Sequence, residues 1–249
     1  MRAILFLAVV LLFFSCEKTS DGSGANASAA SGGTGTGGSL ARFTIVDNYL
    51  YMVDINTLKV FNISNPLNAV QQPSIYLNGG VETIFPYKDK LFIGSRDGMY
   101  IYSLANPAFP VKLGEARHVR SCDPVVANDS IAFVTLLGNQ PCGTAQSGLY
   151  IYNITNITTP VLIKTNLMNT PVGLGLADSI LYVCQKSSGM SIFNVSNPAT
   201  PILRKTITTQ TFEDVIPYNN LLICYISTGL ILYDITNRAN PVQVALINN

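Results

Sequence analysis

Leu149-Tyr150-Ile151-Tyr152-Asn153 is one of five similar segments that decide the fold of this chain. Leucine, β-branched and aromatic residues that end at Asn, Asp or Ser are typical of a β-strand. The other four segments are Leu58–Asn62, Met99–Ser103, Met190–Asn194 and Leu230–Asp234. Successive segments start 41, 50, 41 and 40 residues apart, and self-similarity at such a period indicates a repeat fold.

A turn that begins with asparagine follows each segment, and proline comes directly after this asparagine or four residues later. These asparagines are Asn65, Asn106, Asn156, Asn197 and Asn237. In the second repeat the pattern predicts four strands, at 82–87, 91–95, 99–104 and 111–115, with hairpin turns at Asp89-Lys90 and Asp97-Gly98. The sequence shows no helical periodicity over three turns.

Four-stranded units of about 41 residues have the size of propeller blades, and a ring of five leaves few exposed sheet edges. We therefore predict that residues 40–249 form one all-β domain, a five-bladed β-propeller. The 210 residues of this region lie within the range of a single domain. A β-solenoid is the alternative, but its coils are usually shorter.

The N-terminus has the features of an export signal. Met1-Arg2 precedes twelve apolar residues, Ala3 to Phe14, and Ser15-Cys16 follows. Twelve helical residues rise only about 18 Å, less than the roughly 30 Å of hydrocarbon in a bilayer. The Ser15-Cys16 junction resembles the lipobox of bacterial lipoproteins, in which the cysteine is acylated; an ordinary cleaved signal with an incidental cysteine is the alternative.

We therefore expect residues 1–15 to be a lipoprotein signal peptide and the acylated Cys16 to hold the protein in a lipid bilayer. Residues 16–39 are almost entirely Ser, Gly, Ala, Thr and Asn after the first few positions, which predicts a flexible linker. The predicted location is the cell envelope, with the protein anchored to the outer membrane on its periplasmic side or at the cell surface.

The strand pattern Leu-x-Ile-aromatic-Asp/Asn, followed by Ile/Val-Ser/Thr-Asn-Pro, resembles the LVIVD-repeat proteins. These are predicted propellers found mainly as bacterial lipoproteins, and the resemblance covers all five units. It implies the fold and the location. It implies no activity, because the family carries no agreed function and no catalytic motif that could be transferred to residues of this chain.

Three acidic residues occupy one equivalent position of the repeat, nine residues before a fixed point in the second strand. They are Glu82, Asp123 and Glu213. Because the first strand of each blade lines the central channel, we expect these carboxylates to converge near one mouth of it. Basic residues predicted on the same face are Arg42, Arg96, Arg117, His118 and Arg120. We predict that this mixed-charge mouth binds a partner; a solvated rim of ion pairs is the alternative.

The sequence offers little catalytic equipment. His118 is the only histidine, which excludes a multi-histidine zinc site, and neither a nucleophile elbow nor a phosphate loop is present. We assign the acids of the first hairpin turns, Asp47, Asp89, Asp129 and Asp178, to turn formation. We expect no cofactor and no metal.

A charged fraction of 12% and a net charge of +1 make nucleic acid a poor partner. These features favour a binding module that docks a protein or a glycan. The alternative is a glycan-processing hydrolase or lyase that uses Glu82, Asp123 or Glu213 with His118 as acid and base.

The third repeat is about ten residues longer than the others, and the surplus lies around residues 137–144. Cys142 lies in this loop and Cys122 at the start of the same unit's first strand, on the same face, so we predict a disulfide between them. Two unpaired surface cysteines are the alternative. Cys184 and Cys224 lie in apolar second strands, and we expect them to be buried free thiols in separate side-chain layers.

Overall fold

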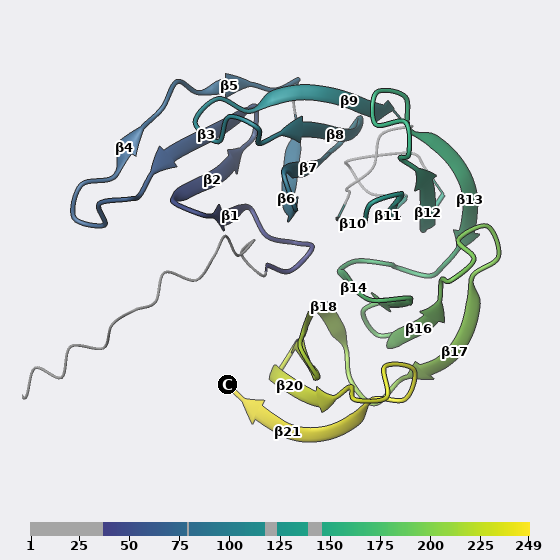
Figure 1. Ribbon diagram of the computed structural model, residues 1–249. Coiled ribbons are helices and arrows are strands. Elements are labelled where there is room, and N and C mark those ends of the chain that lie inside the picture. Colours follow the sequence, from purple (N-terminus) through teal and green to yellow (C-terminus); the bar gives the residue numbers. More distant parts are fainter. Residues whose placement is uncertain (1–36, 79, 118–123, 139–145) are drawn as a thin grey trace, which may run out of the picture. The chain divides into compact units, whose positions relative to one another are not determined.

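The computed structural model describes residues 37–78, 80–117, 124–138 and 146–249. These residues form five antiparallel sheets that follow one another in chain order (Figure 1). The inner strands of successive sheets contact each other around a common centre. The fold is therefore a five-bladed β-propeller, as the repeats predicted.

Each sheet is one blade, and we number the blades in chain order. Blade 1 contains β1 (Phe43–Val46), β2 (Tyr49–Asp54), β3 (Thr57–Asn62), β4 (Val70–Gln71) and β5 (Ile75–Tyr76). Blade 2 contains β6 (Val81–Tyr87), β7 (Lys90–Ser95), β8 (Gly98–Ser103) and β9 (Val111–Arg117). Blade 3 contains β10 (Val125–Ala127), β11 (Ile131–Leu136), β12 (Gly148–Asn153) and β13 (Val161–Leu167).

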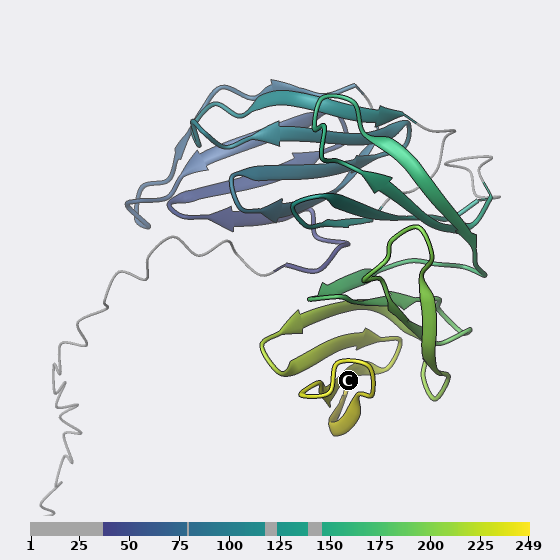
Figure 2. The same cartoon turned by 45° about the vertical axis from the view of Figure 1, so that its right-hand side comes forward.

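Blade 4 contains β14 (Leu174–Ala177), β15 (Ile180–Cys184), β16 (Met190–Asn194) and β17 (Ile202–Ile207). Blade 5 contains β18 (Phe212–Tyr218), β19 (Leu221–Ile226), β20 (Gly229–Asp234) and β21 (Val242–Asn248). In each blade the first strand is innermost, and in blades 2 to 5 the fourth is outermost (Figures 1 and 2). The four strands predicted for the second repeat agree with β6 to β9 to within two residues.

Blade 1 departs from this plan in its outer strand. Two short strands, β4 and β5, both pair with β3 in place of one long strand. Pro73 lies between them. Proline has no backbone N–H to donate to a sheet, so a break at this point is expected.

The turns form as predicted. Asn106 caps its turn by accepting a hydrogen bond from the backbone N–H of Ala108 at 3.2 Å, and Asn65, Asn156 and Asn197 make the same contact two residues on. Asp47 and Asp178 adopt positive φ angles of 52° and 53° in their hairpins. Asparagine and aspartate tolerate this conformation, which explains their place in these turns.

Four apolar clusters hold neighbouring blades together, between blades 1 and 2, 2 and 3, 3 and 4, and 4 and 5. Each cluster combines side chains from one face of a blade with side chains from the opposite face of the next. Among the described residues, no fifth cluster joins blade 5 to blade 1. The core of the domain is therefore a series of four layers.

The start of the described chain provides a contact between the two ends of this series. Ser39 lies ahead of β1 in sequence, yet its hydroxyl donates a 3.0 Å hydrogen bond to Asp214 of β18 and accepts one of 2.8 Å from the backbone N–H of Leu174. The N–H of Leu40 also donates to Asp214, at 3.3 Å. We call residues 37–41 the N-terminal clasp. Residues 37–39, which we assigned to the linker, thus belong to the folded part.

Cys184 and Cys224 are buried free cysteines, as predicted. The prediction that they occupy separate layers is wrong, because both lie in the cluster between blades 4 and 5. The two residues differ by one in repeat position, and successive side chains of a strand point to opposite faces of the sheet. Cys184 therefore points from blade 4 towards blade 5, and Cys224 points from blade 5 towards blade 4. Burial raises the pKa of both thiols, which keeps them protonated.

The predicted insertion is confirmed, since eleven residues, 137–147, connect β11 to β12, whereas two connect β7 to β8. Cys122 and Cys142 lie outside the described residues, as does Cys16 with the predicted signal peptide. Within the described part of the chain, no helix is both long and apolar enough to span a bilayer.

Candidate functional site

The predicted acidic positions coincide with an irregularity in the innermost strands. In β6 the pairing with β7 skips Glu82, because Val81 pairs with Ser95 and Thr83 with Gly94. In β18 the pairing with β19 skips Glu213 in the same way. Each acid is therefore the extra residue of a β-bulge. Bulges redirect side chains and are frequent beside functional sites.

Glu82 lies in a surface pocket together with two of the predicted arginines. The pocket measures about 260 Å³ and is lined by Arg42, Glu82 and Arg96, by Leu40 of the clasp and by residues 55, 80, 81 and 83. It is formed by the β2–β3 turn of blade 1, the entry to β6 and the β7–β8 turn. These segments lie on the face that we predicted to be the channel mouth.

An ion pair forms one wall of this pocket. The Arg96 Nε lies 3.2 Å from the Glu82 Oε1, and both side chains are partly exposed. Gly80 adopts a φ angle of 74°, and a Cβ at this position would lie 2.7 Å from Cδ of Arg96. Glycine at position 80 therefore leaves the space that the Arg96 side chain occupies beside Glu82.

The other predicted residues are not all brought to this pocket. Glu213 does not line it, although the neighbouring Asp214 binds the clasp residue Leu40, which does. Arg117 lies at the end of the outermost strand β9 and pairs with Glu115 at 2.7 Å. The remaining predicted residues, His118, Arg120 and Asp123, lie outside the described residues.

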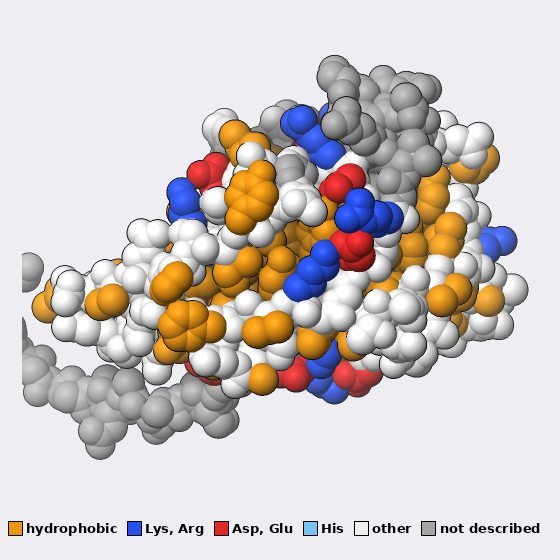
Figure 3. All heavy atoms as spheres, turned by 90° about the horizontal axis from the view of Figure 1, so that it is seen from above, with side chains coloured by type: hydrophobic (Ala, Val, Ile, Leu, Met, Phe, Trp, Pro, Cys, Tyr) orange, Lys and Arg blue, Asp and Glu red, His pale blue; other side chains and the backbone are white. Residues whose placement is uncertain are grey.

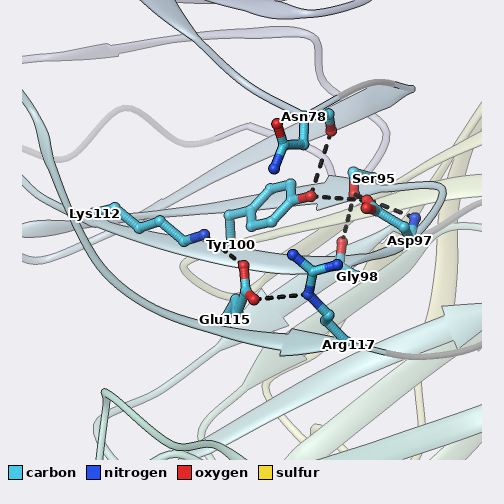
Figure 4. A network of polar contacts seen from close by, with 8 residues as sticks. All are labelled: Asn78, Ser95, Asp97, Gly98, Tyr100, Lys112, Glu115 and Arg117. Carbon is cyan, nitrogen blue, oxygen red and sulfur yellow. Dashed lines mark hydrogen bonds and ion pairs between the residues drawn. The ribbon is translucent and has the colours of Figure 1, made fainter.

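Arg117 belongs to a polar network that the sequence did not reveal (Figure 4). Glu115 of β9 receives hydrogen bonds from Lys112 and Arg117, and these lower the pKa of its carboxyl below the ordinary value. The ammonium group of Lys112 lies 4.8 Å from the ring centroid of Tyr100, within the range of a cation–π contact.

Tyr100 connects this network to the β7–β8 turn. Its hydroxyl donates to Asp97 at 2.8 Å, and the hydroxyl of Ser95 donates to the same carboxylate at 2.7 Å. Burial and the bond to Asp97 raise the pKa of Tyr100 to about 12. The only signal in the sequence was the spacing of Lys112, Glu115 and Arg117, which does not identify their partners.

Acidic and basic side chains thus alternate from the pocket to the outer edge of blade 2. Figure 3 shows the side of the molecule that bears β5 and β9, where such side chains gather among apolar ones. The acids of the hairpin turns behave differently. Asp129 pairs with Lys88 at 2.5 Å and Asp178 with Arg238 at 2.5 Å, each between neighbouring blades, a contact that the prediction of turn formation did not include.

In the part of the chain that is described, no three acidic, cysteine or histidine side chains are placed to hold a metal ion. The pocket itself presents two guanidinium groups and one carboxylate. Two guanidinium groups can bind anionic or carbonyl oxygens, and one carboxylate can accept hydrogen bonds from hydroxyl or amide groups.

Comparison with known proteins supports the repeat assignment. Residues 37–70 and 179–209 match the LVIVD repeat. The first LVIVD match contains the clasp with β1 to β3, and the second contains β15 to β17. No curated protein matches the chain significantly in sequence.

Several solved structures share the fold. A protein from Lactobacillus plantarum is 11% identical with a TM-score of 0.62, and the alignment covers 81% of this chain and 68% of that one. AztD from Citrobacter koseri is 12% identical with a TM-score of 0.58, over 80% of this chain and 59% of that one.

The computationally designed protein Ika8 is also 12% identical with a TM-score of 0.58, over 82% of this chain and 59% of that one. The chain thus spans about 59% of the length of Ika8 and of AztD. At these identities the likeness concerns the fold alone.

Proposed function

We propose that this protein is a lipid-anchored, extracytoplasmic binding module that docks a protein or a glycan at the pocket between blades 1 and 2. The observation that carries the proposal is the pocket of about 260 Å³ in which Arg42, Glu82 and Arg96 come together. All three residues were predicted on this face, Glu82 from its repeat position and the two arginines from the connections beside it. The bulge at Glu82 turns its carboxylate out of the sheet pairing.

The charges suggest the chemistry of the ligand. Guanidinium groups recognise planar carboxylates in a bidentate manner, so Arg42 and Arg96 favour an acidic peptide side chain or an acidic sugar. Glu82 accepts hydrogen bonds from the hydroxyl or amide groups beside such a carboxylate. An ion pair that is already partly exposed can exchange its partner without leaving a buried charge unpaired.

Affinity capture from intact cells tests the proposal. We expect the parent protein to retain a stoichiometric protein or glycan partner, and the double variant Arg42→Gln with Arg96→Gln to lose most of it. Asp89→Ala is the matched control, because Asp89 lies in a hairpin turn and is exposed. Glu213→Ala, measured separately, reports whether the binding face extends to blade 5. Equal retention by the double variant and the control would contradict the proposal.

The anchor is tested independently. Cys16→Ser should release the protein from membranes and abolish incorporation of labelled fatty acid. A variant that still sediments with membranes and is labelled as strongly as the parent would contradict the lipoprotein assignment. Separation of inner and outer membranes of the parent strain tests the proposed location in the outer membrane.

The enzyme alternative receives less support from the pocket. Carboxylate-dependent glycosidases place two carboxyl groups about 5 to 10 Å apart, and Glu82 is the single carboxylate among the residues that line this pocket. Turnover of a glycan panel by the purified protein, abolished by Glu82→Gln, would nevertheless replace the binding proposal with a catalytic one.

A further inference from the structure

Blade 4 departs from the repeat at one position of its third strand. Blade 4 has Ser191 at this position, and the side chain faces blade 3, as does that of Phe193 two residues later. A serine leaves space beside the strand that a longer side chain takes in the other blades. The residues at the equivalent position of blades 1, 2, 3 and 5 are Lys59, Tyr100, Tyr150 and Ile231.

A pocket of about 370 Å³ lies beside Ser191. Two of its walls come from blade 4, and the third is the connection that leads from blade 3 into blade 4. Sites for small molecules measure roughly 300 to 1,000 Å³, so this pocket suits a single ring rather than an extended chain. The lining residues, all of them uncharged, are Leu167, Met168, Asn169, Gln185, Ser191 and Phe193.

Gln185, which directly follows β15, is a second departure from the repeat. The equivalent residues of blades 2, 3 and 5 are Ser95, Leu136 and Ile226. Gln185 is only 8% exposed, and its Nε2 donates a 2.7 Å hydrogen bond to the hydroxyl of Ser191. Within the described part of the chain, no hydrogen bond reaches its amide oxygen. This oxygen is not fully enclosed, so a ligand in the pocket can donate a hydrogen bond to it.

The connection at the edge of the pocket has a strained backbone. Thr170, next to the lining residue Asn169, has a φ angle of 40°, which is an outlier for a β-branched residue. The equivalent residue of blade 2 is Gly80, which adopts its φ angle of 74° without such strain. The Thr170 hydroxyl donates a 3.0 Å hydrogen bond to the backbone carbonyl of Gln185 and so fixes one wall of the pocket to another. Strain of this kind is concentrated at sites that hold ligands.

We propose that this pocket is a second binding site and that it takes the ring of a neutral sugar. The amides of Gln185 and Asn169 can both donate and accept hydrogen bonds, as sugar hydroxyls do. The carbon atoms of a sugar ring can pack against Phe193 and against Leu167, which is 65% exposed. The uncharged lining favours a neutral sugar over an acidic one. This site shares no residue with the charged pocket between blades 1 and 2.

A tyrosine side chain of a peptide is the other ring that this place could take, because Tyr100 and Tyr150 hold the equivalent position in blades 2 and 3. The polar groups of the pocket favour the sugar. The amides of Gln185 and Asn169 come from two different segments, the β15–β16 turn and the connection from blade 3. A phenol has one hydroxyl, whereas a sugar carries hydroxyls around its ring and can bond both amides at once.

Calorimetric titration of the full chain, in a detergent without sugar groups, tests the site with a panel of neutral hexoses and N-acetylhexosamines. We expect saturable binding of at least one of them, with a Kd of about a millimolar. The double variant Gln185→Ser with Ser191→Tyr reproduces the pair of residues in blade 2, so it fills the pocket and should bind at least about 10-fold more weakly. Ser74→Tyr, at an exposed position of blade 1, is the matched control and should bind like the parent.

A second variant keeps the test decisive if the double variant does not fold. Gln185→Leu introduces the residue type that blade 3 has at this position, removes only the amide and should weaken sugar binding by about 10-fold. Thermal unfolding of each variant shows whether it is folded. Three results would overturn the proposal: no saturable binding of any neutral sugar, unchanged affinity in a folded variant of the pocket, or saturable binding of N-acetyltyrosine amide in place of the sugars.

Discussion

Blade 3 and blade 5 repeat the same strand pattern, yet the same residue type has a different environment in each. Leu149 is fully buried between blades 3 and 4, whereas Leu230 at the equivalent position is partly exposed. The two leucines have the same local sequence context, so the difference comes from the neighbouring blade. Burial in a repeat protein therefore depends on position in the series as much as on the residue.

The largest effect is expected from the matched pair Leu149→Ala and Leu230→Ala. Removal of the enclosed side chain should lower the free energy of unfolding by about 3 kcal/mol, because a cavity remains between two blades. The same change in blade 5 should cost less than about 1 kcal/mol. Urea titration of each variant and of the parent measures both changes. Equal losses would show that Leu230 is enclosed in solution as fully as Leu149.

Ser39→Ala tests how much the clasp, which links blade 1 to blade 5, contributes to the stability of the end blades. The buried hydroxyl bonds Asp214 and the Leu174 N–H, so its removal leaves both groups without this partner and should cost about 1 to 3 kcal/mol. Ser74→Ala, at an exposed hydrogen bond, is the control. If both variants unfold at the same urea concentration, the clasp contributes nothing to stability.

A third prediction concerns pH. Burial raises the pKa of Asp214 above 3.8, so the folded protein binds this proton more tightly than the unfolded chain does. The contribution of Asp214 to stability is therefore greatest below the ordinary pKa and falls as the pH rises through the folded-state value. Asparagine keeps the acceptor oxygen without the charge, so Asp214→Asn should be more stable than the parent near neutral pH.

Thermal unfolding at about pH 4 and about pH 7 measures this difference, which should narrow at the lower pH. Asp89→Asn is the opposite control. The hydrogen bond from Lys90 lowers the pKa of Asp89, so its contribution is present above the ordinary value and is lost as the pH falls. An Asp214→Asn variant with the same pH dependence as the parent would contradict the prediction.

The smallest effect is expected at the rim of the pocket. Arg96→Gln removes an ion pair between partly exposed side chains and should change the free energy of unfolding by at most about 1 kcal/mol, with a smaller difference at high salt. Calorimetry at two salt concentrations measures it. A loss as large as that of Leu149→Ala would mean that this pair supports the fold rather than a ligand.

The strands and turns followed from the sequence because their causes are local. Alternating apolar residues define the strands, and Asn106 or Asp178 defines a turn through its own side chain and backbone. The equivalence of Glu82 and Glu213 also followed, since it needs only the repeat. The bulge that explains their exposure did not, because it depends on the pairing with the second strand.

Other features depend on contacts that no local pattern reports. Ser39 and Asp214 are 175 residues apart, and the sequence between them does not indicate that they meet. Arg117 pairs with Glu115 on the same outer strand, and the sequence did not indicate this partner. The sequence also did not indicate that, among the described residues, no apolar cluster joins blade 5 to blade 1, because the end blades have sequences as apolar as those of the interior.

The clasp also determines how the domain would carry a mechanical load. A force applied to the chain ahead of Gly37 reaches Ser39 before it reaches any strand. Through Asp214 and Leu174 it is then shared by β18, β14 and β1, three inner strands of different blades. Peeling of the first blade from its neighbour would thus require rupture of the hydrogen bonds of Ser39 first.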